Sequence, residues 1–262
     1  MSLIDELLTD LRAETADLES LPIGPRDWER ATPAEGWMVR DQIGHLAFFD
    51  EAATRAVADP VGFRGALAGL TPDFVDLQAD EARALPVQGV REWFRTARGT
   101  MLETFATLGV KDRVPWYGPD MSAASFITAR LMETWAHGQD IADALGVRRT
   151  PTARLRHVAT IGVRALPYGF AVRGLPVPVE PVRVELVMPD GTPWAAGPED
   201  AADTVRGPML DFCLLVTQRI HRDDTALEVS GETAAAWMGI AQCFAGGPGK
   251  GRQPGGSQGD AG

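Results

Sequence analysis

The sequence has no long apolar run. Its 262 residues contain no uninterrupted apolar stretch of the roughly 18 residues that a membrane-spanning helix needs. The first segment, from Met1 to Leu8, is acidic, whereas a signal peptide begins with basic residues. These two absences predict a cytoplasmic protein that does not have a membrane as a partner.

Cysteine is also scarce. The chain has 2 cysteines, Cys213 and Cys243, which lie far apart and form neither a CxxC pair nor a zinc-ribbon spacing. Such sparse cysteine suits a reducing compartment. Both are expected to be buried apolar side chains, and neither lies in a motif typical of a nucleophile.

Positive charge is in deficit. The chain has 25 Lys and Arg residues against 36 Asp and Glu residues, a net charge of -11, and no basic cluster interrupts the acidity. Nucleic-acid affinity depends on Lys and Arg side chains that neutralise phosphates, so nucleic acid is excluded as an expected partner. An anionic small substrate stays compatible with this charge, because one buried arginine can bind a carboxylate.

What the chain does have is amphipathic helical patterning in its first half, and its hydrophobic content of 45% can form a core. Turn and cap signals separate the apolar stripes: Asp59-Pro60 is expected to end the second helix, and Ser122 and Gly146 are expected to be the N-cap and the C-terminal stop of the last helix of this half. The stretch 109–121 is predicted to be a loop, in which residues 114–119 would form a lid or a pocket wall. Five helical segments are predicted, at residues 3–21, 39–57, 72–84, 87–108 and 123–145. The four long ones describe a helical bundle, in which metal ligands commonly point inward from facing helices.

The sequence pattern changes in the second half of the chain. Another helix is expected at 153–172, and a proline-rich linker follows at 174–181. Strands are predicted at 182–188, 193–196, 203–206 and 226–230, and helices at 208–220 and 233–244. The predicted fold class is therefore α+β, with a helical domain at 1–150, a small α+β domain at 151–245 and a glycine-rich, disordered tail at 246–262.

Three residues carry the strongest chemical signal. Glu133 and His137 are four residues apart on one predicted helix, so their polar ends can converge on one point. His45, on an earlier helix, would supply a third vertex. Two imidazoles and a carboxylate are ligands of a zinc-like divalent metal, and three protein ligands leave a position free for water or substrate. The alternatives are a surface hydrogen bond between Glu133 and His137, and a core imidazole at His45.

Four segments resemble a known family, two in each half of the chain. The stretch from Gly36 to Leu46 and the stretch from Met132 to Gly146 are similar to motifs of the mycothiol-dependent maleylpyruvate isomerase family. Leu214 to Arg219 and Leu227 to Gly231 look like the C-terminal domain of the same family. The resemblance implies a DinB-like metal-binding four-helix bundle followed by a small sterol-carrier-like α+β domain.

The resemblance also implies cofactors. In the family a divalent metal, usually zinc, is held by one histidine on the second helix and by a glutamate and a histidine on a later helix, which here correspond to His45, Glu133 and His137. Coordination to such a metal turns a thiol into a thiolate at neutral pH. The thiol in the family is mycothiol, so a low-molecular-weight thiol and a small-molecule substrate are the expected partners.

Three further residues are candidates for supporting roles. Arg219 lies where the family's C-terminal domain contributes an arginine toward the metal, and it would clamp a substrate carboxylate as a catalytic residue. The alternative for Arg219 is a solvated surface pair. Asp41, four residues before His45, and Asp140, three residues after His137, would accept hydrogen bonds that orient the imidazoles, or would be ordinary charges on helix surfaces.

The predicted function is a metal-dependent, mycothiol-utilising transferase or isomerase in which the metal activates a thiol toward a small electrophile. One alternative is a metal-assisted hydrolase or a natural-product cyclase that uses no thiol. Another is a non-catalytic small-molecule binding protein on the same fold. The sequence leaves open the substrate, the choice of metal and the oligomeric state.

Overall fold

The computed structural model describes residues 2–69 and 74–255. The chain divides into two compact units, Met1–Arg148 and Arg149–Gly262. The division lies two residues before the end predicted for the helical domain. The first unit is helical apart from one small hairpin, and the second combines short helices with a four-stranded sheet, so the predicted α+β class is confirmed.

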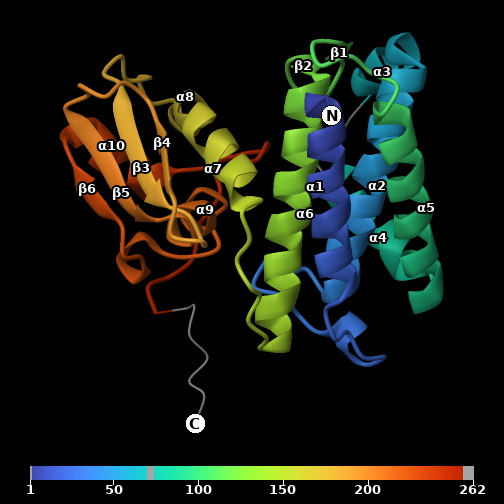
Figure 1. Ribbon diagram of the computed structural model, residues 1–262. Helices are drawn as coiled ribbons and strands as arrows, with labels where there is room; N and C mark the ends of the chain where they lie inside the picture. The colour runs from blue at the N-terminus through green and yellow to red at the C-terminus, as the bar shows by residue number, and fades with distance from the viewer. Residues whose placement is uncertain (1, 70–73, 256–262) are drawn as a thin grey trace. The chain divides into compact units, whose positions relative to one another are not determined.

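Four long helices build the first unit, and all four were predicted. Helix α2 packs along α5, and α1 packs along α6 (Figure 1). Their bounds are α1 Leu3–Glu19, α2 Val39–Ala58, α5 Val87–Phe105 and α6 Ala123–Leu145. The helix ends follow local chemistry: the Ser122 hydroxyl accepts a hydrogen bond from the backbone N–H of Ser125 at 3.2 Å, and Gly146 ends α6 with φ +67°.

Shorter elements complete the first unit. They are η1 (Asp27–Glu29), α3 (Pro60–Leu67), α4 (Phe74–Ala84), and the hairpin strands β1 (Arg113–Val114) and β2 (Met121–Ser122). Helix α3 was not predicted, because Pro60 was interpreted only as the end of α2. Pro60 instead begins α3, where the missing N–H of proline costs nothing. Pro72, the predicted start of α4, lies outside the described residues.

The bundle contains a buried ionic cluster beside its apolar core. Asp50 on α2 is fully buried and accepts hydrogen bonds from Arg98 Nε on α5 at 2.6 Å and from Arg130 Nε on α6 at 3.0 Å. Arg98 Nη2 also donates to the Thr134 hydroxyl at 3.0 Å, and Arg130 Nη2 donates to the Leu46 carbonyl at 3.1 Å. The ion pairs of this buried ionic cluster therefore join three of the four long helices, and Arg98 Nη1 also donates to the Thr15 hydroxyl on α1, the fourth.

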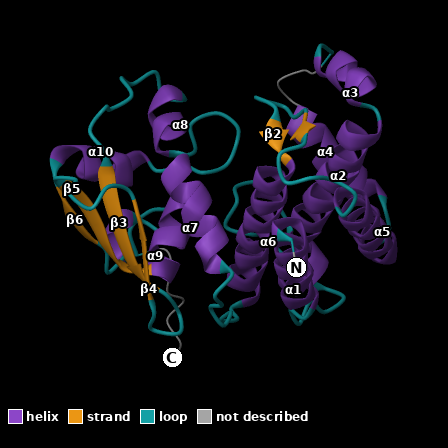
Figure 2. Ribbon diagram, turned by 45° about the horizontal axis from the view of Figure 1, so that its top comes forward, coloured by secondary structure: helices purple, strands orange, loops and turns teal. Residues whose placement is uncertain are grey.

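The second unit contains the predicted sheet. Its strands are β3 (Val182–Val187), β4 (Pro193–Ala196), β5 (Asp203–Pro208) and β6 (Glu228–Ser230), in the order β4-β3-β5-β6 (Figure 2). Strands β3 and β5 are parallel, and the other two pairings are antiparallel. The described helical elements of this unit are α7 (Leu155–Arg164), α8 (Leu166–Ala171), α9 (Met209–Val216), η2 (Arg222–Asp224) and α10 (Glu232–Ile240).

Two predictions for the second unit need correction. The single helix expected at 153–172 is two helices, because Pro167 cannot donate a backbone hydrogen bond and its ring would clash within a continuous helix.

The tail was predicted to be disordered from residue 246. Instead, the Gly249 N–H donates to Gln242 Oε1 at 2.9 Å and the Gly255 N–H donates to Asp224 Oδ2 at 2.8 Å. The prediction stays untested for residues 256–262, which lie outside the described residues.

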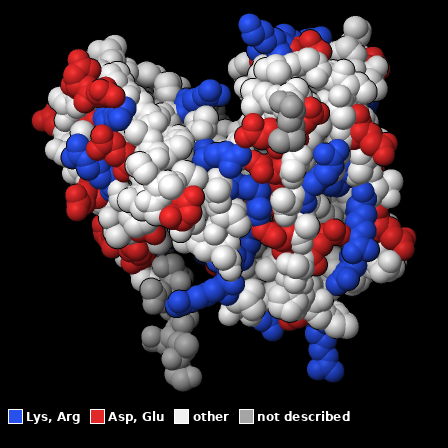
Figure 3. Space-filling view, viewed as in Figure 1, with Lys and Arg blue, Asp and Glu red and all other residues white. Residues whose placement is uncertain are grey.

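Charged side chains of both signs lie on one face of the first unit (Figure 3). On the face of the first unit that Figure 3 presents, basic and acidic side chains are interspersed. Arg64 and Asp120 form one such exposed pair, with 2.7 Å between Nη2 and Oδ2. Within the described parts of the chain, the helices are too short or too polar to cross a membrane.

Candidate metal centre

The three predicted ligands come together in the first unit. His45 projects from α2, and Glu133 and His137 project from successive turns of α6. One ligand atom from each side chain lies within 4.8 Å of the other two. His137 is buried, while His45 and Glu133 are partly buried. The side chains therefore converge from two helices and keep some access to solvent.

Glu133 and His137 make direct contact, with 3.1 Å between Glu133 Oε2 and His137 Nε2. Burial raises the pKa of the Glu133 carboxyl, but the hydrogen bond to His137 and the nearby charges of His137, His45 and Arg130 lower it more, to about 2. The carboxylate is therefore ionised at neutral pH, and it can act as a ligand without first releasing a proton.

The other nitrogen of His137 has a partner that sequence reasoning missed. Nδ1 of His137 is hydrogen-bonded to Oε1 of Gln42, whose side chain is fully buried on α2. The Gln42 amide nitrogen donates to the Thr32 hydroxyl at 2.9 Å. The available signal was the position of Gln42, three residues before His45, which places both on neighbouring parts of one helix face.

Aromatic side chains surround the two imidazoles. The Trp37 ring lies 5.1 Å from His45 and stacks on His137 at 5.9 Å, and the Phe49 ring lies 4.5 Å from His45. The loop between β1 and β2 extends this wall, since Tyr117 meets Phe49 edge to face at 5.4 Å. Burial raises the pKa of the Tyr117 hydroxyl to about 12, partly offset by Arg55. This loop was predicted to form a lid or pocket wall.

The structure gives different results for the two aspartates that were predicted to orient the imidazoles. For Asp41 the prediction is wrong: its carboxylate accepts from Arg83 Nη2 at 2.8 Å and from the Met38 backbone N–H at 2.8 Å. At the third position of α2, that carboxylate is within reach of the free N–H groups that begin the helix. Asp140 is buried on α6, and its predicted role toward His137 stays a prediction.

Arg219 belongs to the second unit, just after α9. Its Nη1 donates to the Thr217 carbonyl at 2.5 Å, and its guanidinium lies 5.9 Å from the centre of the Phe244 ring. The side chain is partly buried, and the alternative of a surface pair stays untested. A role toward substrate stays a prediction.

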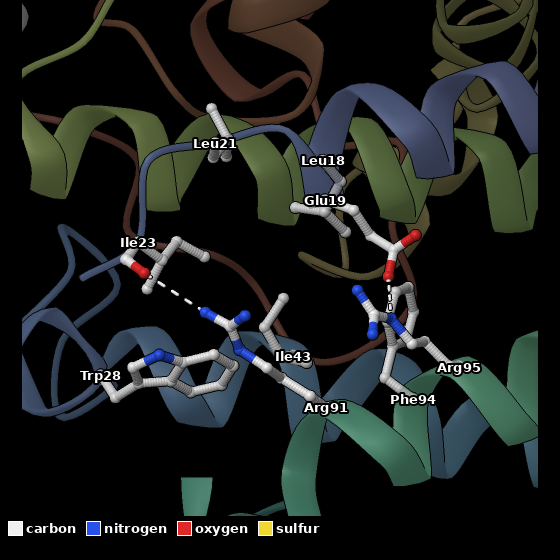
Figure 4. Close-up of a pocket in the computed structure, with 9 residues that line it drawn as sticks. All are labelled: Leu18, Glu19, Leu21, Ile23, Trp28, Ile43, Arg91, Phe94 and Arg95. Carbon is white, nitrogen blue, oxygen red and sulfur yellow. Dashed lines mark hydrogen bonds and ion pairs between the residues drawn. The ribbon is translucent and has the colours of Figure 1, made fainter. Parts of the chain in front are cut away.

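A hollow in the first unit lies apart from these residues. Its volume is about 380 Å³ including the part open to solvent, and none of its lining residues is a predicted ligand (Figure 4). Two arginines at this hollow already have acceptors. Arg91 Nη2 donates to the Ile23 carbonyl at 3.2 Å, and Arg95 Nε donates to Glu19 at 2.5 Å. The hollow adds no chemistry to the three candidate ligands.

Comparison with known families agrees with this arrangement. Residues 8–142, just over half of the chain, match the family model for the mycothiol maleylpyruvate isomerase N-terminal domain. This range contains all three candidate ligands. Residues 178–228, in the second unit, match a family model described as wyosine base formation.

Whole proteins give the same picture. The chain is 47% identical over 251 residues to an uncharacterized protein of Mycobacterium tuberculosis, found in strains CDC 1551 and H37Rv, with 94% of this chain and 97% of that protein covered. The crystal structure of a mycothiol-dependent maleylpyruvate isomerase matches with a TM-score of 0.60 at 19% identity, covering 89% of this chain and 94% of that one. A single-substitution mutant of such an isomerase matches with a TM-score of 0.58 at 18% identity, covering 84% and 90%. These solved structures share the fold, and the family model assigns the bundle: the chain belongs to the mycothiol maleylpyruvate isomerase family.

Proposed function

We propose that this protein is a metal-dependent enzyme that uses mycothiol to isomerise or to conjugate a small electrophile. One observation supports the proposal above all others. Two imidazole nitrogens and one carboxylate oxygen, from two facing helices, lie within 4.8 Å of one another in a chain of the mycothiol maleylpyruvate isomerase family.

The donor set fits a divalent cation. Zinc bonds to nitrogen and oxygen ligands are about 2.0–2.2 Å long, so the ligand atoms of a tetrahedral site lie about 3.3–3.6 Å apart. His137 Nε2 and Glu133 Oε2 are already 3.1 Å apart. Drawing the more distant ligand atoms inward by about 1 Å would complete the set, which side-chain rotation about χ angles can supply.

The hydrogen bonding of His137 gives a second reason for a cation. Gln42 Oε1 can only accept, so His137 Nδ1 must carry a proton, and in a neutral imidazole Nε2 is then an acceptor. Two acceptors, Nε2 and the Glu133 carboxylate, would face each other at 3.1 Å. Either a second proton on the imidazole or a metal ion must lie between them.

Each residue of the proposed site would have a separate role. A divalent cation bound here, with one coordination position open, would supply a thiolate from mycothiol at neutral pH. His45, Glu133 and His137 would hold that ion. Trp37 and Phe49 would exclude water beside the imidazoles, which strengthens electrostatic interactions within the site. Arg219 is proposed to bind a carboxylate of the substrate.

Three measurements test the proposal. Purified protein is analysed for bound metal by mass spectrometry, and mycothiol-dependent conversion of maleylpyruvate is followed by chromatography. We expect stoichiometric metal, and an unfolding temperature that mycothiol raises only when the metal has not been removed by a chelator, because a ligand that binds the native state stabilises it. Protein without stoichiometric metal would favour the binding-protein alternative. Holoprotein that mycothiol does not stabilise would favour the hydrolase or cyclase.

A further inference from the structure

A chain of hydrogen bonds leads from a backbone carbonyl to His137. The carbonyl of Trp37 accepts from the Thr32 backbone N–H at 2.8 Å and lies 2.9 Å from the Thr32 hydroxyl oxygen. A carbonyl can only accept hydrogen bonds. The single hydroxyl hydrogen of Thr32 therefore points at Trp37, and the Thr32 oxygen is left as an acceptor toward its other neighbour.

That neighbour is Gln42, and its orientation follows. Of the two ends of the Gln42 amide, only the nitrogen can donate to the Thr32 oxygen, 2.9 Å away. Its amide oxygen must then face the opposite way, toward His137 Nδ1. The side chain of Gln42 is fully buried, so solvent water does not compete for either end of the amide.

We propose that Thr32 and Gln42 are positioning residues that fix the tautomer of His137, with the proton on Nδ1 and the lone pair of Nε2 directed at the metal position. This inference rests on the proposed function, since it assigns the chain of bonds to metal binding. The Trp37 carbonyl fixes the direction of the Thr32 hydroxyl hydrogen. The Thr32 oxygen then fixes the orientation of the Gln42 amide, and this amide fixes the tautomer of the imidazole. Neither Thr32 nor Gln42 touches the ion.

An amide in this place has an electrostatic consequence. The usual partner of a metal-bound histidine is a carboxylate or a backbone carbonyl, and a carboxylate would add a negative charge next to the site. Gln42 supplies the same acceptor without that charge. Glu133 would then be the one anionic ligand among the three, so a divalent ion would keep a net charge of +1 with which to attract an incoming thiolate or a carbonyl oxygen.

Three substitutions test the chain of bonds. Gln42→Leu removes the acceptor, Gln42→Glu adds the negative charge, and Thr32→Val removes the hydroxyl while keeping its shape. Thr128→Val is the matched control, because Thr128 is as buried as Thr32, 9% exposed in each case, and its hydroxyl donates to the Ala124 carbonyl of its own helix. Zinc affinity of metal-free protein is measured by competition with a chromophoric chelator.

Loss of an outer partner of this kind typically costs about 10- to 100-fold in metal affinity. We expect a loss in that range for Gln42→Leu, a smaller loss for Thr32→Val, tighter binding for Gln42→Glu and no change for Thr128→Val. In the metal-free wild type at alkaline pH, where imidazole is neutral, nitrogen-15 NMR should find the His137 proton on Nδ1. Should Gln42→Leu fail to fold, Thr32→Val and Gln42→Glu still decide the matter.

The outcomes separate the two proposals. A wild-type protein that binds zinc, with the His137 proton on Nε2 or with zinc affinity unaltered in both Gln42→Glu and Thr32→Val, overturns the positioning role and leaves the proposed function standing. A wild-type protein that binds no zinc overturns the proposed function, and with it any metal role for Gln42.

Discussion

The buried ionic cluster offers the most demanding test of the structure. In Asp50→Asn the shape of the side chain is kept, but its charge is removed from between Arg98 and Arg130. All three side chains are at most 4% exposed. Two guanidinium groups would then remain in the bundle interior without the carboxylate that lies between them in the wild type, and the new amide N–H would face one of them.

The expected cost is large. Removing one partner of a buried ion pair typically destabilises a protein by about 3–5 kcal/mol, because the remaining charge is left uncompensated. A folded domain is stable by about 5–15 kcal/mol in total. For a unit of this size each kcal/mol shifts the unfolding temperature by about 2–4 °C, so a decrease of about 6–20 °C is expected for Asp50→Asn.

Urea unfolding, followed by helical circular dichroism, gives the free energy directly. The control is Asp120→Asn, the same substitution in the exposed pair with Arg64, which should cost no more than about 1 kcal/mol. An Asp50→Asn protein within about 1 kcal/mol of the wild type would refute the reasoning, because it would mean that the guanidinium groups reach solvent or another acceptor.

Three further predictions concern the site. His137→Ala should abolish both metal binding and activity while leaving helical circular dichroism unchanged, with His221→Ala as the control; stoichiometric metal in the variant would count against the ligand assignment. Arg219→Ala should raise the apparent KM for a carboxylate substrate while metal is retained, with Arg206→Ala as the control, and unaltered kinetics would contradict the proposed role of Arg219 toward substrate. Because the pKa of Glu133 is lowered from 4.5 to about 2, its stabilising contribution is complete above pH 4.5 and disappears as pH falls through about 2. In chelator-treated protein, the stability difference between wild type and Glu133→Gln should therefore shrink across that range, and a difference independent of pH would contradict the lowered pKa.

Periodicity and caps were sufficient to locate the helices of the bundle. Helix α6 is the clearest case: Ser122 and Gly146 were predicted as its N-cap and its C-terminal stop, and both act so. Proline was harder to interpret from the sequence, because it can either end one helix or begin the next. Pro60 does both, and Pro167 divides a segment whose apolar pattern runs straight through it.

The site was predictable only in part, for a physical reason. The convergence of Glu133 and His137 follows from helical spacing alone. The partner of His137 does not, since Gln42 lies 95 residues away and its role depends on how α2 packs against α6. Asp41 was the more obvious candidate by charge, but its carboxylate accepts from the backbone N–H of Met38 and from the guanidinium of Arg83. Asp41 and Gln42 are both fully buried, so charge and burial do not distinguish them, and the packing of α2 against α6 places Gln42 at His137.

The buried ionic cluster shares the helices α2 and α6 with the candidate ligands, and the cluster positions the ligands. Arg130 on α6 donates to the carbonyl of Leu46, the residue next to His45 on α2. Glu133 follows Arg130 by one helical turn, so this bond fixes how far α6 can slide along α2 and hence the distance between the ligands of the two helices. Packed apolar side chains tolerate a small shift of one helix along another. Buried charges tolerate such a shift poorly, because a displaced guanidinium loses its acceptors. Burying this cluster costs desolvation energy, but the cluster holds His45 opposite Glu133 and His137. This positioning gives a physical reason for the protein to retain it.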